Sequence, residues 1–196
     1  VLYSWNAENW KPRTPVQIEK GFTNFDISPD DRTLLFFNDQ ALLFWRGARD
    51  TFRVKIPHLD RYCFSPGGDE FFFFDGQQAK VYSLELRGNE MVQQRDYKNV
   101  QQRKGEKAEK RAEPRLLANT NFEVIGMACE NGSLWLAGRD SIIRLELSGL
   151  KDRQWKTVQS VAWDANIPYN VTGVQLNPGR QVAWLLSTDS LFYFRL

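Results

Sequence analysis

The most constraining feature of this chain is a recurring pair of apolar runs joined by a turn that contains aspartate. The second run of each pair follows the aspartate directly at residues 39–46, 140–146 and 189–195, and after one extra turn residue at 75–82. The first runs lie just upstream, at residues 33–37, 133–136, 182–186 and 70–74. Because Asp and Gly tolerate the backbone angles of tight turns, each pair predicts a β-hairpin.

Each hairpin is flanked by further short runs with strand character. The upstream runs lie at residues 23–27, 61–64, 122–127 and 171–176, and turns rich in Pro, Gly and Asp join them to the hairpins at 28–31, 65–68, 130–132 and 177–179. The downstream runs lie at residues 51–56, 91–94 and 155–158. The resulting unit of four strands repeats about every 40 residues, which predicts an all-β repeat architecture.

The second hairpin strand resembles the signature strand of the WD40 family, which begins after a turn aspartate and closes on a Trp-Asp dipeptide. At the ends of these strands, Phe44-Trp45-Arg46 and Ser4-Trp5-Asn6 are the closest matches to that dipeptide, and the Ser-Pro turns at 28–31 and 65–68 are similar to those of the family. The chain resembles a divergent member, because none of the predicted blades contains a Gly-His pair or a Trp-Asp dipeptide. The resemblance implies a β-propeller of four-stranded antiparallel blades.

The repeat divides residues 1–196 into successive units. These are a part-blade at 1–21, blades at 22–57 and 58–97, a basic loop at 98–115, a blade at 116–160 and a part-blade at 170–196. Both end units have fewer than four strands, and proteins avoid open strand edges. We therefore expect the chain to be an incomplete, C-terminal part of a larger propeller. The alternative is that about four blades close by themselves.

The four consecutive phenylalanines at residues 71–74 are typical of a strand that neighbouring units cover on both faces. Most of the other aromatic residues also fall on expected strands. Core packing therefore explains the aromatic residues better than ligand stacking does.

Charge and cysteine content restrict the setting. Residues 95–115 hold eight Lys or Arg against four Asp or Glu, with few apolar residues, which is typical of a solvated surface loop. Binding of nucleic acid through this segment is the less favoured interpretation. The two cysteines, Cys63 and Cys129, show no redox or disulfide pattern, and no apolar run is long enough to span a membrane. We expect an intracellular, cytoplasmic setting with no membrane partner.

The sequence offers no motif for catalysis. It contains no phosphate-binding glycine loop, no His/Cys/carboxylate cluster with metal-ligand spacing, and a single histidine, His58, which we expect in a loop. We therefore expect no cofactor, no metal and no enzymatic activity in this chain.

A binding function remains. In the propeller arrangement the hairpin turns share one face, which would bring together Asp39, Asp75, Asp140 and Asp189. A rim of carboxylates would steer a basic protein segment, although turn chemistry alone also accounts for each aspartate. We expect a protein-interaction propeller, acting as scaffold or ligand-sensing module of a larger protein or complex. Its partners would include the remaining blades or another subunit. The alternative is the non-catalytic propeller of a hydrolase or peptidase whose active site lies outside this chain.

Overall fold

A computed structural model describes residues 21–46, 51–86, 113–130, 132–139, 141–148, 154–162, 171–187 and 190–195. Within these ranges the chain forms fifteen β-strands and one short 3-10 turn, η2 (Pro178–Arg180), with no α-helix. The prediction of an all-β chain is confirmed. Over the same ranges, no helix is long and apolar enough to cross a membrane.

The strands form four antiparallel sheets, in each of which strands adjacent in sequence are also adjacent in space. Sheet 1 contains β1 (Asn24–Ile27), β2 (Leu34–Phe37), β3 (Ala41–Trp45) and β4 (Thr51–Lys55). Sheet 2 contains β5 (Arg61–Phe64), β6 (Glu70–Asp75), β7 (Lys80–Glu85) and β8 (Arg115–Asn119). Sheet 3 contains β9 (Gly126–Glu130), β10 (Ser133–Ala137), β11 (Ser141–Ser148) and β12 (Gln154–Ala162). Sheet 4 contains β13 (Val171–Asn177), β14 (Val182–Ser187) and β15 (Leu191–Arg195).

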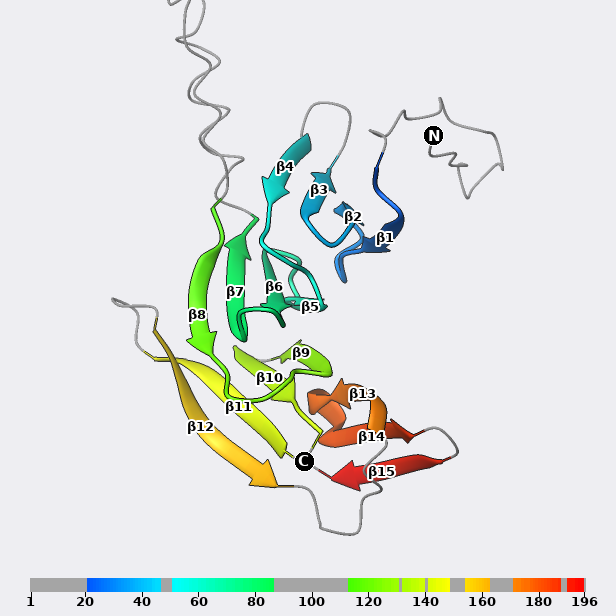
Figure 1. Cartoon of the computed structure of the whole chain (residues 1–196), viewed down its shortest axis with the longest axis vertical. Coiled ribbons are helices and arrows are strands. Elements are labelled where there is room, and N and C mark those ends of the chain that lie inside the picture. Colours follow the sequence, from blue (N-terminus) through cyan, green and yellow to red (C-terminus); the bar gives the residue numbers. More distant parts are fainter. Residues whose placement is uncertain are drawn as a thin grey trace, which may run out of the picture.

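The four sheets follow one another in a curved row (Figure 1). The first strand of each sheet lies on the inner side of the curve, and β4, β8 and β12 lie on the outer side. The inner strands of successive sheets touch, since β5 contacts β9 and β9 contacts β13. Each sheet packs its face against the face of the next one, because buried side chains of neighbouring sheets share core clusters.

Apolar cores fill the spaces between the sheets. Strand β6 contributes to two of them, because its side chains alternate between its faces. Phe71 and Phe73 pack with Phe44 against sheet 1, whereas Phe72 and Phe74 pack against sheet 3. All four phenylalanines of this strand are fully or almost fully buried. The expectation that neighbours cover this strand on both faces is confirmed.

The turns between the first and second strands owe their shape to residues with positive φ. These are Asp31, Gly68, Gly132 and Gln181, with φ between 54° and 73°. Three of the four are Asp or Gly, residues that enter this region most readily. In sheet 1 the Ser28 hydroxyl also accepts a hydrogen bond from the Thr33 amide at 2.9 Å. The turns predicted at these places are present.

Two predicted strands require correction. The fourth strand of sheet 2 is β8, and not residues 91–94, which lie outside the described residues together with most of the basic loop. Arg115–Asn119 thus belongs to the second unit, so the predicted division between 58–97 and 116–160 does not follow the sheets. The first strand of sheet 3 begins at Gly126, later than predicted, because Val124 and Ile125 are buried in the preceding connection and only resemble a strand in sequence. Residues 1–20 also lie outside the described residues.

Candidate partner-binding face

One face of the molecule gathers the hairpin turns and the links between sheets. We call it the connection face, and define it by the turns at 38–40 and 76–79 and the connections at 56–60 and 120–125. Backbone hydrogen bonds join each connection to a turn. The Leu59 amide donates to the Asp39 carbonyl at 3.0 Å, and the Thr120 amide donates to the Ala79 carbonyl at 2.8 Å. These bonds fix the connections in place against the turns.

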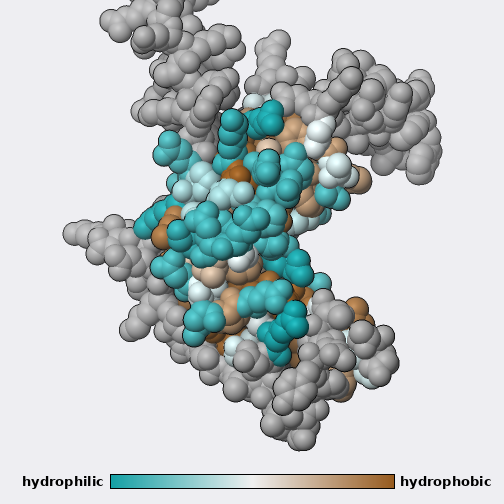
Figure 2. All heavy atoms as spheres, in the orientation of Figure 1, coloured by the Kyte–Doolittle hydropathy of each residue, from teal (hydrophilic) through white to brown (hydrophobic). Residues whose placement is uncertain are grey.

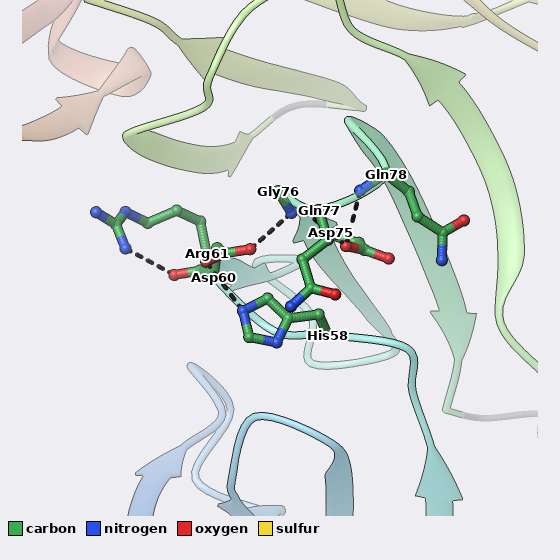
Figure 3. A network of polar contacts seen from close by, with 7 residues as sticks. All are labelled: His58, Asp60, Arg61, Asp75, Gly76, Gln77 and Gln78. Atoms are coloured by element: carbon green, nitrogen blue, oxygen red, sulfur yellow. Dashed lines mark hydrogen bonds and ion pairs between the residues drawn. The ribbon is translucent and has the colours of Figure 1, made fainter.

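Asp75 ends strand β6 and organises the turn that follows. Its Oδ1 accepts hydrogen bonds from the amides of Gln77 at 2.9 Å and Gln78 at 3.1 Å (Figure 3). The side chain is fully buried, and its Oδ2 has no hydrogen-bond partner. Asp75 Oδ1 therefore accepts hydrogen bonds from amides two and three residues ahead, as aspartate commonly does in turns.

The Asp60 carboxylate contacts both the connection between sheets 1 and 2 and the β6–β7 turn (Figure 3). Its Oδ2 accepts a hydrogen bond from the Gly76 amide at 2.6 Å, and its Oδ1 lies 3.3 Å from His58 Nε2. Its own amide donates to the Phe74 carbonyl at 3.0 Å. Asp60 thus ties the connection between sheets 1 and 2 to the β6–β7 turn, and it remains partly exposed.

Arg61 carries the network across to sheet 3. One guanidinium nitrogen, Nη1, donates to the Asp60 carbonyl at 2.7 Å, and Nε donates to the Ile125 carbonyl at 3.0 Å. Ile125 lies in the connection that leads into β9. Because the planar guanidinium spans both carbonyls, it fixes the position of that connection relative to sheet 2.

A second polar link joins the inner strands of sheets 1 and 2. The Tyr62 hydroxyl donates a hydrogen bond to Asp26 Oδ2 at 3.0 Å. Burial raises the pKa of Tyr62 well above its ordinary value, and the negative charge of Asp26 raises it further. The phenol therefore stays protonated near neutral pH, and acts as a fixed hydrogen-bond donor.

Two of the four predicted partner-binding aspartates can be placed. Asp39 lies in the β2–β3 turn with an exposed side chain, whereas Asp75 is the buried last residue of β6, next to the β6–β7 turn. They stand on either side of the 56–60 connection, which bonds to both turns. Asp140 and Asp189 lie outside the described residues. The role of the four residues in partner binding stays a prediction.

Sequence reasoning missed Asp60 and Arg61. Their partners lie 16 and 64 residues away along the chain, so no local motif marks them. The one available signal was His58, the single histidine of the sequence, which stands two residues before Asp60 in the same connection.

The connection face also contains a shallow basic depression beside Asp39. Its volume is about 290 Å³, and it is lined by Asn38, Gln40, Ala41, Arg53, Lys55, Ile56 and Pro57. Arg53 lies over the ring of Phe22, with its guanidinium carbon 5.5 Å from the ring centre. The face therefore presents charges of both signs around the β2–β3 turn.

The described residues offer no assembled chemistry for metal binding or for thiol attack. No group of three or more His, Cys, Asp or Glu in the described ranges could hold a metal ion. Cys63 and Cys129 are free thiols on β5 and β9. Burial raises the pKa of the Cys63 thiol, and burial together with nearby carboxylates raises that of Cys129 to about 12. Both thiols are thus protonated at neutral pH, the form that is not nucleophilic.

Comparison with known proteins supports the fold alone. No family model matches the chain, and no curated protein matches it. Among solved structures, the chain is similar to a functionally unknown protein from Desulfotomaculum acetoxidans DSM 771, with a TM-score of 0.59 and 12% sequence identity. The match covers 99% of this chain and 61% of that one, so this chain spans under two thirds of the length of its structural neighbour.

Proposed function

We propose that the four sheets are consecutive blades of a divergent WD40-like β-propeller that serves as a protein-interaction module. It acts as a scaffold or ligand sensor within a larger protein or complex, in an intracellular, cytoplasmic setting. The order of strands within each sheet and the inner position of each first strand support this proposal. The proposal assigns no catalytic step to the chain.

The observation that carries the proposal is the bonding of the connection face. Each connection among the described residues of sheets 1 to 3 is bound to a hairpin turn, and Asp60 and Arg61 extend these bonds from sheet 2 to its neighbours. A surface that is already ordered loses little conformational entropy when a partner binds. Such a face suits recognition of a protein segment better than a mobile loop would.

The charges on this face indicate what kind of segment would bind. Asp39, Asp60 and Glu123 are the exposed or partly exposed carboxylates of this face, and Glu123 is paired with Arg139. Arg53 and Lys55 line the depression beside Asp39. A protein segment that carries a basic residue next to an acidic one would match this pattern. Complementary charges of this kind act mainly on the association rate and on specificity.

The test compares two identical substitutions on opposite faces. Asp39→Asn removes a charge from the connection face, and Asp31→Asn removes one from the opposite turn, where asparagine also tolerates the positive φ. Both variants are used to capture partners from a lysate, with quantitative mass spectrometry. We expect Asp39→Asn alone to reduce capture of a specific partner at low salt. Equal capture by both variants would show that the connection face is not the binding surface.

A further inference from the structure

The two ends of the row of sheets expose large apolar side chains. Brown, apolar residues reach the surface near both ends, whereas the middle of the visible face is mostly teal (Figure 2). At one end, Phe25 and Ile27 of β1 are 64% and 48% exposed. Asp26 between them bonds to Tyr62 of sheet 2, so alternation along the strand points Phe25 and Ile27 away from that sheet.

At the other end, a compact apolar surface covers the face of sheet 4 that points away from sheet 3. We call it the terminal face, which consists of Trp184, Leu186, Leu191 and Tyr193, each between 40% and 61% exposed. The register pairs Trp184 with Tyr193 and Leu186 with Leu191 on adjacent strands. The rings of Trp184 and Tyr193 meet edge to face, with centres 5.0 Å apart. The four side chains therefore form one continuous patch.

The terminal face continues a pattern that the other sheets establish. In β10, Leu134 and Leu136 pack toward sheet 2, whereas Trp135 and Ala137 pack toward sheet 4. In β14, Ala183 and Leu185 pack toward sheet 3, which leaves Trp184 and Leu186 on the side where a following sheet would lie.

Trp135 and Trp184 occupy matching positions. Each stands three residues after the positive-φ residue of its turn, which is Gly132 in sheet 3 and Gln181 in sheet 4. Trp135 is 9% exposed because Leu176 and Ala183 of the next sheet cover it, and Trp184 is 40% exposed. Tryptophan at this position is thus buried in sheet 3, which another sheet covers, and exposed in sheet 4, the last of the described sheets.

We propose that the terminal face is an interface for a further antiparallel β-sheet of the same polypeptide, with aliphatic side chains packed over Trp184. The inference rests on the propeller proposed above, and it identifies where the next blade attaches. Continuity with three existing sheet interfaces supports it. The length of the Desulfotomaculum protein supports it too, because nearly the whole of this chain matches only 61% of that polypeptide.

The test is hydroxyl-radical footprinting of the complete natural polypeptide and of the 196-residue chain. In the complete polypeptide, Trp184 should be oxidised about fourfold more slowly, the ratio of 40% to 9% exposure. Leu116, which is 47% exposed on β8, is the internal control and should react equally in both samples. Equal oxidation of Trp184 in both samples would overturn the proposal, as would an intact mass of 22.9 kDa for the natural polypeptide.

A second copy of the chain is the main competing occupant. It would protect Trp184 in the 196-residue chain itself, with protection rising with concentration and a doubled mass in light scattering, and this result would also overturn the proposal.

If the short chain fails to fold, matched variants in the complete polypeptide decide the question. Leu186→Lys should lower the unfolding temperature by roughly 5 °C or more, because it buries a charge, and Leu116→Lys should not. Equal effects would refute the interface. If Asp39→Asn and Asp31→Asn capture partners equally while Trp184 is still protected, only the proposed binding function is refuted.

Discussion

Replacing Gly76 with alanine would place a methyl group where the Asp60 carboxylate now lies. The added Cβ would be 2.6 Å from Asp60 Oδ2 and 3.1 Å from Asp60 Cγ, which is too close for either atom to stay in place. The backbone of Gly76 lies outside the positive-φ region, so backbone strain does not add to the cost. The carboxylate must therefore turn away, and it loses the Gly76 amide and the contact with His58.

The size of the effect follows from what the carboxylate loses. A hydrogen bond to a charged group contributes about 1.5–3 kcal/mol to stability. Because the Asp60 side chain is 36% exposed, the displaced carboxylate regains part of its hydration, which lowers the expected cost to about 1–2 kcal/mol. With a typical urea dependence for a small domain, the unfolding midpoint would fall by roughly 0.5–1 M.

The assay is urea unfolding followed by tryptophan fluorescence, with Gly173→Ala as the matched control. A Cβ at Gly173 would meet nothing nearer than 4.0 Å, so this variant should stay within about 0.5 kcal/mol of the parent. Gly76→Ala is then repeated in an Asp60→Ala background, where the obstacle is gone and the cost should vanish. The same cost in both backgrounds would refute the role assigned to Asp60.

Three further outcomes follow from burial and charge. Leu134→Ala should destabilise the protein by about 2–5 kcal/mol in urea unfolding, whereas the same change at half-exposed Leu116 should cost under about 1 kcal/mol; similar costs would contradict the packing between sheets 2 and 3. Cys63 and Cys129 should react with iodoacetamide at pH 8 far more slowly in the folded than in the urea-unfolded chain, because burial raises the pKa of both thiols, and equal rates would argue against it. A hydrogen bond from the Ser28 hydroxyl lowers the pKa of Asp30 below its ordinary value of 3.8. The ionised Asp30 side chain therefore stabilises the fold above pH 3.8, and this stabilisation is lost as the pH falls through the lower pKa of the folded state. Asp30→Asn should accordingly reduce stability at pH 7 and lose its effect in acid, as measured by unfolding at several pH values.

The strand pattern was predictable where local sequence and packing agree. Residues 61–64 form a strand with the predicted bounds, and the phenylalanines of β6 are buried on both sides as expected. Prediction failed at residues 122–127, where Val124 and Ile125 are apolar because a buried connection packs into the cores. Apolar content alone does not distinguish such a connection from a strand.

The candidate face was only partly predictable, for a related reason. Turn chemistry is local, so the aspartate types and positions in the turns could be inferred from the sequence. Whether a turn aspartate faces solvent depends on distant neighbours, which is why Asp39 is exposed and Asp75 is buried. Asp60 and Arg61 also bond to such neighbours, Gly76 and Ile125, which lie 16 and 64 residues away, and a single sequence does not show those contacts.

Sheet 2 contains strands from both sides of the basic stretch, because β7 pairs with β8. Its first three strands end at residue 85, and its fourth begins at Arg115, the last residue of the basic stretch at 95–115. A break in the polypeptide between these strands would leave two fragments that each lack part of sheet 2. The β7–β8 ladder and the packing of β5 on β9 would still bind them to each other. We therefore expect the order of the sheets to survive such a break, because contacts between strands hold the two fragments together without the backbone link.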